Sequence, residues 1–482
     1  MPAATTMSSE LARQLGLIRP KDVVQVERKK AASILYTSTE AVRISRTQIR
    51  EIGQNGFTEL LQLEPRLQEY EEPLFGKHTA QFERGLLTAE DTGPVDAQIE
   101  RFLRLISPFL ERKAAHKAVE HLIRCFEANI YNVDSLLAAA LPFHQTDFFG
   151  RLVGVCHIAG SSLWHFLERA KRSKAPLVRA TLVQQGIKEK GFVDFVASTT
   201  LKALTEGYET ARPAISFATV LLLEILQRVD SGQENLLRAL LAFSLECVSY
   251  KTSPEAQAAG LLLLCQFAHR HSLPNAVFQQ IVVLICDSLP RRADQRQAVF
   301  VALASLFQAQ GGAAPDQLTF PKDALLLMLR SQCDICACFE ATKASGYRVG
   351  PLLLPLTLAL FSYIQHDNAA TDEDPLKALA ALQRLILDQV FAAAKSDPRN
   401  DCLSASSAKR LCAALLSAYF AFFQSASSHA AQNPRSASAF RSIMDALVAR
   451  FSAPFDEAVA GFISSATQAT RSARLEFLSS LQ

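Results

Sequence analysis

The sequence predicts an all-α fold, an α-solenoid of HEAT/armadillo-like helical repeats, from its composition, its helical periodicity and the spacing of its helices. Hydrophobic residues make up 49% of the 482 residues, whereas only 19 are glycine and one is tryptophan. Alanine, leucine, glutamine, glutamate, arginine and lysine fill most segments, and all of them favour helices. This composition indicates helices around a real core and argues against sheets with tight turns.

Helical patterns follow one another along the first part of the chain. The segment 38–63 keeps apolar residues three and four positions apart after a Ser or Thr cap. This pattern predicts one helix that ends before Pro65. Segments 95–110 and 113–130 predict an antiparallel pair that is split around Glu111.

The rhythm becomes clearer from Pro213 onward. Predicted helices pair in the order 212–229 with 233–250, 253–271 with 273–289, and 291–310 with 321–339. Two helices in about 40 residues is the period of HEAT and armadillo arrays. Each unit leaves an apolar face that its neighbour covers, so the array offers long helical surfaces.

Charge and cysteine usage restrict the class of protein. The formal net charge is only +3, so the chain as a whole is not a polycation. Nearly all of the ten cysteines lie in apolar helical patterns, and the opening residues lack the apolar core of a secretory signal. We expect a reducing intracellular compartment and no disulfides. The most apolar runs are too short or too interrupted for a membrane span of about 20 residues, so no membrane association is predicted.

Two groups of residues resemble metal sites. "CDICAC" contains Cys333, Cys336 and Cys338, but a structural zinc site needs four ligands, and no second Cys or His pair lies nearby. We interpret these cysteines as core residues. His269 and His271 close an apolar helix, where histidine favours the helix C-terminus.

No catalytic set is visible in the sequence. His116 and His121 are five positions apart rather than the four that a helical metal-binding pair needs. The chain contains no GxxxxGK loop, no GxSxG elbow and no DxDxDG loop. The sequence therefore predicts no enzyme, no cofactor, no metal and no small-molecule substrate.

Basic residues cluster in the first 200 positions and offer two interpretations. In the first, these cations bind phosphates without reading the nucleotide sequence. In the second, they are simply the water-exposed charged residues of a helix face. One weak cluster comprises Arg43, Arg46 and Arg50. The residues that we assign to the RNA-phosphate hypothesis are Arg28, Lys29, Lys30, Arg169, Lys171, Arg172 and Lys174.

The stretch "IYNVDSLLAAALPFHQTDFFGRLV", residues 130–153, first suggests a catalytic or metal site. Its pattern predicts a short helix capped by Asn132 or Asp134 and a second helix that starts at Pro142. His144 and Asp147, three positions apart, could then meet on one helix face. A single pair without a third partner falls short of a catalytic set, so we expect a structural or interface role.

Several spaced motifs resemble a known family. The segments "ERKKAASILYTSTEAV" and "GFTELLQLEPRLQEYEEPLFG" are followed by "HLIRCFEANIYNVDSLLAAALPFHQTDFFGRL" and "APLVRATLVQQGIKEKGFVDFV". In this order they resemble the N-terminus of the U3 small nucleolar RNA-associated protein 10 family, also called HEAT repeat-containing protein 1. The resemblance covers about residues 25–205. Cys125 and Glu127 stand where the family has more basic or aromatic residues, which argues against nucleic-acid binding by that helix.

The resemblance implies a large nucleolar, nuclear HEAT-repeat scaffold of the UtpA (t-UTP) subcomplex of the small-subunit processome. Such a scaffold acts in pre-rRNA processing, 18S rRNA maturation and ribosome biogenesis, and is linked to rDNA transcription. The implied partners are other UtpA subunits, through helical C-terminal domains of WD40 β-propeller proteins, and the 5′ external transcribed spacer of pre-rRNA. The alternatives are direct RNA-phosphate binding and a generic transport or adaptor solenoid. Asparagine ladders on the inner helices would favour the second alternative, and the sequence shows none.

The resemblance also organises the chain. It implies a family-specific helical region over 1–210, while the helical pattern predicts HEAT-like repeats over 211–365 and further repeats over 376–482. A polar, acidic linker is predicted at 366–375, and we expect the repeats to continue into a longer protein.

The stretch 130–153 carries the family signature "YN.DSL…LP(Y/F)H". The residues that match this signature are Tyr131, Asn132, Asp134, Ser135, Leu136, Pro142 and His144. Most of them should fix a helix–helix corner, with Phe148 and Phe149 reaching a neighbouring helix or a partner. The proposed partner-interface residues are Tyr131, Phe143, His144, Asp147, Phe148 and Phe149.

Overall fold

The computed structural model describes residues 32–86, 88–289, 293–311, 318–331, 333–366, 374–386, 405–429 and 434–481. All regular secondary structure in these ranges is helical, which confirms the all-α prediction. The chain divides into two compact units, Met1–Leu177 and Val178–Gln482. None of the helices in the described part of the chain has the length and apolar character needed to cross a membrane.

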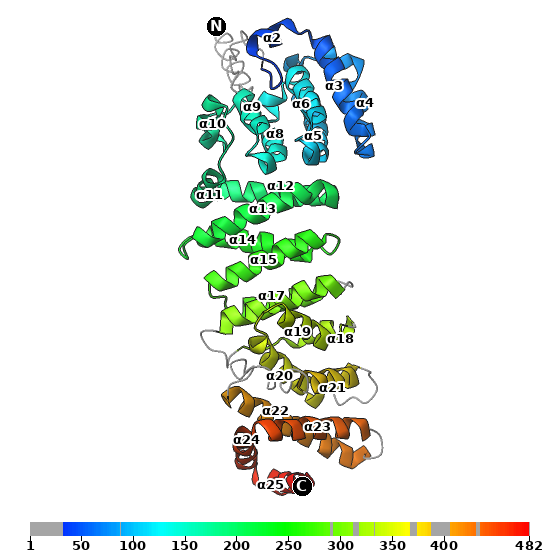
Figure 1. The fold of residues 1–482 in the computed structure, drawn as a ribbon, viewed down its shortest axis with the longest axis vertical. Coiled ribbons are helices and arrows are strands. Elements are labelled where there is room, and N and C mark those ends of the chain that lie inside the picture. Colours follow the sequence, from blue (N-terminus) through cyan, green and yellow to red (C-terminus); the bar gives the residue numbers. More distant parts are fainter. Residues whose placement is uncertain are drawn as a thin grey trace, which may run out of the picture. The chain divides into compact units, whose positions relative to one another are not determined.

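The first unit combines helices of very different lengths (Figure 1). In chain order its α-helices are α2 (Ser38–Arg43), α3 (Arg46–Leu61), α4 (Glu71–Phe75), α5 (Ala89–Ile106), α6 (Lys113–Phe126), α7 (Ala128–Tyr131), α8 (Val133–Ala140), α9 (Asp147–Val155) and α10 (Glu168–Ser173). Its 3-10 helices are η1 (Pro65–Tyr70), η2 (Lys77–Gln81), η3 (Arg84–Leu86), η4 (Ser107–Phe109), η5 (Leu141–Phe143) and η6 (His165–Leu167).

The single helix predicted over 38–63 is wrong, because the chain breaks between α2 and α3. Ser45 is extended, with φ −71° and ψ 156°, and its side chain accepts a hydrogen bond from the Gln48 backbone N–H. The Gln48 side chain accepts from the Ser45 backbone N–H at 2.9 Å. This capping box starts a new helix rather than continuing the previous one.

The core of the first unit forms where α3 packs closely against α6. A Cβ atom on Gly56 would lie only 2.5 Å from the Ala114 carbonyl oxygen, so glycine permits this approach. Three fully buried rings extend the core, since the Phe75 centroid lies 4.6 Å from that of Phe57 and 5.3 Å from that of Phe102. Such aromatic pairs add about 0.5–1.5 kcal/mol each beyond the area they bury.

The second unit is a regular succession of longer helices (Figure 1). In chain order they are α11 (Arg179–Lys188), α12 (Lys190–Thr205), α13 (Tyr208–Arg228), α14 (Glu234–Ser249), α15 (Pro254–Arg270), α16 (Asn275–Asp287), α17 (Ala293–Gly311), α18 (Lys322–Arg330), α19 (Ile335–Ala344), α20 (Gly350–His366), α21 (Asp374–Arg384), α22 (Ala405–His429), α23 (Pro434–Arg450), α24 (Ser452–Ser464) and α25 (Gln468–Ser479).

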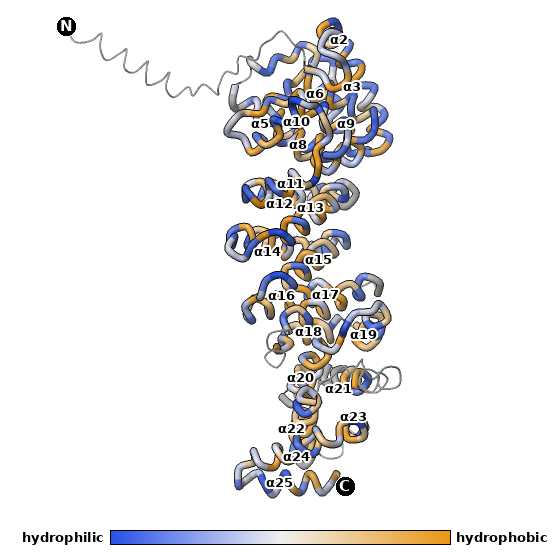
Figure 2. Tube along the Cα trace, turned by 60° about the vertical axis from the view of Figure 1, so that its left-hand side comes forward, coloured by the Kyte–Doolittle hydropathy of each residue, from blue (hydrophilic) through white to orange (hydrophobic). Residues whose placement is uncertain are grey.

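Alternate helices of the second unit build two layers. Helices α11, α13, α15 and α17 pack successively on one another, and α12, α14, α16 and α18 do the same. Hydrophobic and hydrophilic residues alternate along these helices (Figure 2), as expected when each buries one stripe against its neighbours. This arrangement is the predicted α-solenoid.

The predicted pairing of α13 with α14 is shifted by one helix. Helix α14 packs extensively against α15 and only slightly against α13. Gly260 of α15 explains the close approach, because a Cβ atom there would lie 2.6 Å from the Ser244 carbonyl oxygen of α14. The predicted helix 321–339 is likewise two helices, since Asp334 caps α19 by accepting from the Ala337 N–H at 3.1 Å.

The predicted regional boundaries remain predictions. The division between the two compact units of the structure falls between Leu177 and Val178, which is within the predicted first region. Most of the predicted linker, residues 367–373, lies outside the described residues.

Candidate functional site

Residues 130–153 fold into four short helices, α7, α8, η5 and α9. The helix predicted to start at Pro142 is wrong, because Pro142 lies in the 3-10 turn η5 and α9 begins at Asp147. Thr146 caps α9 by accepting a hydrogen bond from the Phe149 N–H at 3.3 Å. His144 precedes the helix and is buried, whereas Asp147 lies in its exposed first turn. The two residues therefore share no helix face.

His144 lies in the corner between α8 and α9 and connects this corner to the segment that follows α10. Its ring Nδ1 donates to the Leu177 carbonyl oxygen at 2.8 Å, and its own carbonyl accepts from the Leu177 N–H at 2.8 Å. The side chain is only 3% exposed. A buried histidine whose ring N–H is committed to a carbonyl is a structural clamp rather than a catalytic base.

Two glycines of α9 let the end of α10 lie against it. Lys174 adopts the left-handed conformation, with φ 51°, directly after α10. A Cβ atom on Gly150 would lie 2.5 Å from the Lys174 carbonyl oxygen, and one on Gly154 would lie 3.1 Å from the Lys174 side chain. These contacts fix the position of Lys174. They bring a residue of the RNA-phosphate hypothesis against the helix that carries the partner-interface residues Phe148 and Phe149.

The basic residues of α10 and its C-terminal end form what we call the α10 basic cluster, comprising Arg169, Lys171, Arg172 and Lys174. Glu168 offsets part of its charge, pairing with Lys171 at 3.7 Å and with Arg172 at 4.0 Å. Arg169 and Lys174 are exposed and form no ion pair with a described residue. The cluster therefore keeps an excess of positive charge.

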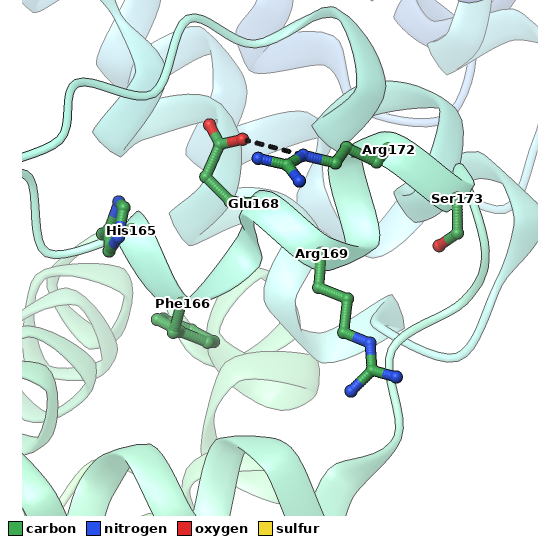
Figure 3. Close-up of a pocket in the computed structure, with 6 residues that line it drawn as sticks. All are labelled: His165, Phe166, Glu168, Arg169, Arg172 and Ser173. Carbon is green, nitrogen blue, oxygen red and sulfur yellow. Dashed lines mark ion pairs between the residues drawn. The ribbon is translucent and has the colours of Figure 1, made fainter.

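An open depression of about 850 Å³ lies along this cluster. Its lining residues are His165, Phe166, Glu168, Arg169, Arg172 and Ser173. Figure 3 shows the Glu168 carboxylate directed at Arg172, while the Arg169 guanidinium points away from both. The depression therefore combines an exposed guanidinium, an aromatic ring and a hydroxyl, groups that suit a phosphate and a stacked base.

The other predicted basic residues have different positions. Arg28, Lys29 and Lys30 lie outside the described residues. Among the second group, Arg43 is exposed and Arg50 is half-buried, while Arg46 donates to the Phe82 carbonyl at 2.9 Å. Arg46 therefore connects α3 to the segment around Phe82 and has a structural role.

Tyr131 and Asn132 belong to a buried network around Arg84. The Arg84 side chain is 1% exposed, pairs with Asp96 and donates to the Asn132 side-chain oxygen at 2.7 Å and to the Phe126 carbonyl at 3.1 Å. Its guanidinium carbon lies 4.6 Å from the centre of the Tyr131 ring, a cation–π contact. Burial lowers the pKa of Arg84, while nearby Tyr131 and Glu127 act in the opposite direction.

The predicted cap of α8 is correct in position, but the capping hydrogen bond is not formed. Asn132 lies at the cap position, but its side chain makes no capping hydrogen bond and instead donates to Asp96 at 2.9 Å. Asp134 lies in the first turn of α8 and accepts from the Trp164 indole N–H at 2.6 Å. Both signature residues connect distant segments.

The proposed interface residues differ in exposure. Phe148 and Phe149 are buried, and Phe148 reaches α6, where its ring stacks on His116 with centroids 4.2 Å apart. Phe143 is half-buried, Asp147 is exposed and Tyr131 is 44% exposed. We therefore keep the partner-interface prediction for the residues that reach the surface.

The histidines of α6 donate to carbonyl oxygens. His116 Nε2 bonds to Leu110 and His121 Nε2 to Leu74, each at 2.7 Å. Burial lowers the pKa of His121 to about 4 and also lowers that of His116. Both are therefore neutral near pH 7, with His121 buried in the core and His116 half-buried. On the same helix, Cys125 is buried and Glu127 adopts the left-handed conformation at its end.

The histidines at the end of α15 lie where the sequence predicts. His269 occupies the last turn and is exposed, and His271 is the C-cap, its ring 5.2 Å from that of Phe267. No group of three or more His, Cys, Asp or Glu residues suited to a metal ion occurs among the described residues.

Sequence comparisons extend the resemblance beyond the motifs. Residues 236–360 match the family model of U3 small nucleolar RNA-associated protein 10, in the part of the chain where the motifs are absent. The chain is 28% identical over 325 residues to human HEAT repeat-containing protein 1, covering 66% of this chain and 15% of the human protein.

Fungal and insect relatives give the same result. The chain is 31% identical over 287 residues to U3 small nucleolar RNA-associated protein 10 of Schizosaccharomyces pombe, covering 59% of this chain and 17% of the yeast protein. It is 26% identical over 380 residues to a HEAT repeat-containing protein 1 homolog of Drosophila melanogaster, covering 76% and 17%. The resemblance is confirmed, and the chain spans less than a fifth of these relatives.

Proposed function

Because this chain is related to the family of U3 small nucleolar RNA-associated protein 10 and HEAT repeat-containing protein 1, we propose that it is part of a non-enzymatic scaffold of ribosome biogenesis. It acts in the nucleolus as part of the UtpA subcomplex of the small-subunit processome. There it supports pre-rRNA processing and 18S rRNA maturation and is linked to rDNA transcription. The family-model match over residues 236–360, together with the separate motif resemblance over about residues 25–205, carries the proposal.

The helical surfaces support a scaffold role. Exposed apolar side chains occur on neighbouring helices of one layer, where Val220 of α13 is 39% exposed and Leu262 of α15 is 51% exposed. The first unit adds the exposed Tyr131 ring. Stacked helices of this kind present extended surfaces to partners. The partners that we propose are other UtpA subunits, through the helical C-terminal domains of WD40 proteins.

Co-purification of this chain with each UtpA subunit tests the proposal. We expect at least one subunit to bind, and binding to none of them would contradict a UtpA scaffold. Tyr131→Ser should weaken capture if the corner contacts the partner. Tyr347→Ser is the matched control, because Tyr347 is a similarly exposed tyrosine, 46% exposed, that belongs to the second unit.

Direct contact with pre-rRNA phosphates is a second candidate function, favoured by the two α10 cluster cations that have no ionic partner among the described residues. We propose that Arg169 and Lys174 contact the 5′ external transcribed spacer. Replacing both by alanine should weaken binding of this RNA and make the salt dependence shallower by about two phosphate contacts. Glu168→Gln should strengthen binding, because it removes the only acidic residue that lines the depression.

Lys190→Ala is the matched control for RNA binding. Lys190 is exposed but already pairs with Asp194 at 2.5 Å. Its loss should change the affinity less than the loss of Arg169 and Lys174. Equal effects would mean that the binding is non-specific, and undetectable binding of the unmodified chain would eliminate this function.

A further inference from the structure

The "CDICAC" segment places two of its three thiols side by side. Cys333 Sγ lies 3.6 Å from Cys338 Sγ, whereas Cys336 is directed elsewhere, at 3.6 Å from the Ala381 carbonyl oxygen. Cys333 precedes α19 and Cys338 lies in its first turn, so the extended backbone of Asp334 between Cys333 and the helix allows the two thiols to meet. A disulfide needs sulfurs about 2.05 Å apart, so rotation of the side chains must close about 1.5 Å.

Exposure distinguishes this pair from most other cysteines of the chain. Cys333 and Cys338 are partly exposed, whereas Cys336 is 1% exposed. Most of the remaining described cysteines are buried, with Cys265 the exception. An oxidant in solution therefore has better access to the pair than to Cys336 between them.

The local charges make the two thiols unequal. The hydrogen bond between the two thiols, and then the nearby Arg296 guanidinium, lower the pKa of Cys333 against the effect of burial. The same hydrogen bond, together with burial, raises the pKa of Cys338. Cys333 is therefore the more nucleophilic sulfur at neutral pH, because the thiolate is the reactive form.

We propose that Cys333 and Cys338 are a redox-active dithiol, which hydrogen peroxide converts to an intramolecular disulfide. The Cys333 thiolate attacks one peroxide oxygen, the O–O bond breaks, and the released hydroxide takes a proton to give water and a sulfenic acid. Cys338 then attacks the sulfenic sulfur, forming the S–S bond and releasing a second water. Two thiols are oxidised to one disulfide while one peroxide is reduced to two waters.

The modification would act on a junction of three helices. Asp334, next to Cys333, caps α19 and pairs with Arg384 of α21 at 3.1 Å, while Arg296 belongs to α17. A disulfide around this cap would hold the start of α19 in place between α17 and α21. Intracellular disulfides are commonly transient and redox-sensing, which suits a pair formed from free thiols.

Peptide mass mapping of the whole chain tests the proposal. Hydrogen peroxide is added to the folded protein, free thiols are blocked, and the tryptic peptide 331–343, which contains all three cysteines, is analysed. We expect this peptide to lose two hydrogen atoms and to retain one blockable thiol. Cys333→Ser and Cys338→Ser should each abolish the loss, whereas Cys336→Ser should preserve it.

Three results would overturn the assignment. The peptide could gain oxygen without losing hydrogen, it could stay fully reduced while other cysteines oxidise, or Cys336→Ser could abolish the disulfide. Far-UV circular dichroism of each serine variant separates a chemical effect from misfolding. Since serine is close in size to cysteine and both reacting thiols are partly exposed, we expect the variants to fold.

Discussion

The two units of this molecule are held together in different ways. The first unit depends on buried polar groups that bridge distant segments, such as Arg84 with Asn132 and His144 with Leu177. The second unit depends on close helix packing around small residues, as where Gly260 of α15 meets α14. A single polar substitution should therefore damage the first unit, whereas the second should respond mainly to changes of volume.

Another buried polar group in the first unit makes the contrast clearer. Glu120 is fully buried and accepts from the Ile34 N–H at 2.8 Å, which holds a segment that precedes α2 against α6. The second unit also contains buried polar residues, but several bond within their own helix, as Ser244 does to the Leu240 carbonyl at 2.7 Å. Bridging groups fix an irregular arrangement, while local ones leave the stacking to apolar contacts.

The single tryptophan allows the two units to be observed separately. Trp164 is 1% exposed and belongs to the first unit, so its fluorescence reports the unfolding of that unit alone. Far-UV circular dichroism reports the helices of both units.

Arg84→Ala should have the largest effect. It removes a fully buried guanidinium, so Asp96 loses its ion pair and the Asn132 side-chain oxygen loses the Arg84 donor. Breaking a buried ion pair in this way costs about 3–5 kcal/mol. Because Asp96 is half-exposed, we expect a loss of stability near the lower end of this range. Denaturant unfolding followed by Trp164 fluorescence measures the loss.

Arg101→Ala is the matched control for Arg84. Arg101 is 48% exposed and pairs with Glu69 at 3.4 Å, so its loss should cost less than about 1 kcal/mol. If the two alanine variants were equally stable, buried polar bridges would not be the basis of this unit.

Acid should weaken the first unit through His121, with the next largest effect. Burial lowers the pKa of His121 to about 4 in the folded chain, from 6.5 when unfolded. Between these values the unfolded state binds more protons, so stability falls as the pH is lowered from 6.5 to 4. The loss amounts to about 3 kcal/mol over this window. Urea unfolding at several pH values, followed by Trp164 fluorescence, measures it.

His121→Gln should remove most of this pH dependence, because glutamine does not titrate but can still donate to Leu74. The control is His78→Gln, since the His78 side chain is 54% exposed. The control should retain the acid sensitivity. A similar flattening in both variants would mean that other groups cause the acid sensitivity.

The sequence predicted the second unit better than the first for a physical reason. Ser253 and Pro254 mark the start of α15 in the sequence, and the structure begins that helix at Pro254. The role of Arg84 was missed because one of its partners, the Phe126 carbonyl, is supplied only by the tertiary fold. No periodicity encodes such a contact.

Two other features were not predicted, and only one of them was visible in the sequence. The capping box of Ser45 with Gln48 was visible in the sequence as the spacing S-x-x-Q, and could have revealed the break before α3. The Cys333–Cys338 contact could not have been found this way, because residues five apart do not face each other on a regular helix. It arises only because Cys333 precedes the helix.

Gly260→Ala should destabilise the second unit by about 2 kcal/mol, since the added methyl collides with the α14 backbone. Gly461→Ala in α24 is the control, because nothing lies within 4 Å of the new methyl. It should instead stabilise that helix by about 0.5–1 kcal/mol. Circular dichroism should detect both changes. An equal shift of the Trp164 transition in Gly260→Ala would show that the units do not unfold independently.

The smallest expected effect comes from removing one helix cap in each unit. Thr146 caps α9 and Ser253 caps α15, and each side chain accepts a backbone N–H at 3.3 Å. Because both caps are hydroxyl groups that accept one backbone N–H, alanine at either position should cost about 1 kcal/mol. The Trp164 fluorescence midpoint should move only in Thr146→Ala, and Ser253→Ala should change only the circular dichroism. A fluorescence shift in both variants would mean that a small loss in one unit spreads to the other, so that their different interiors would not make them separate in stability.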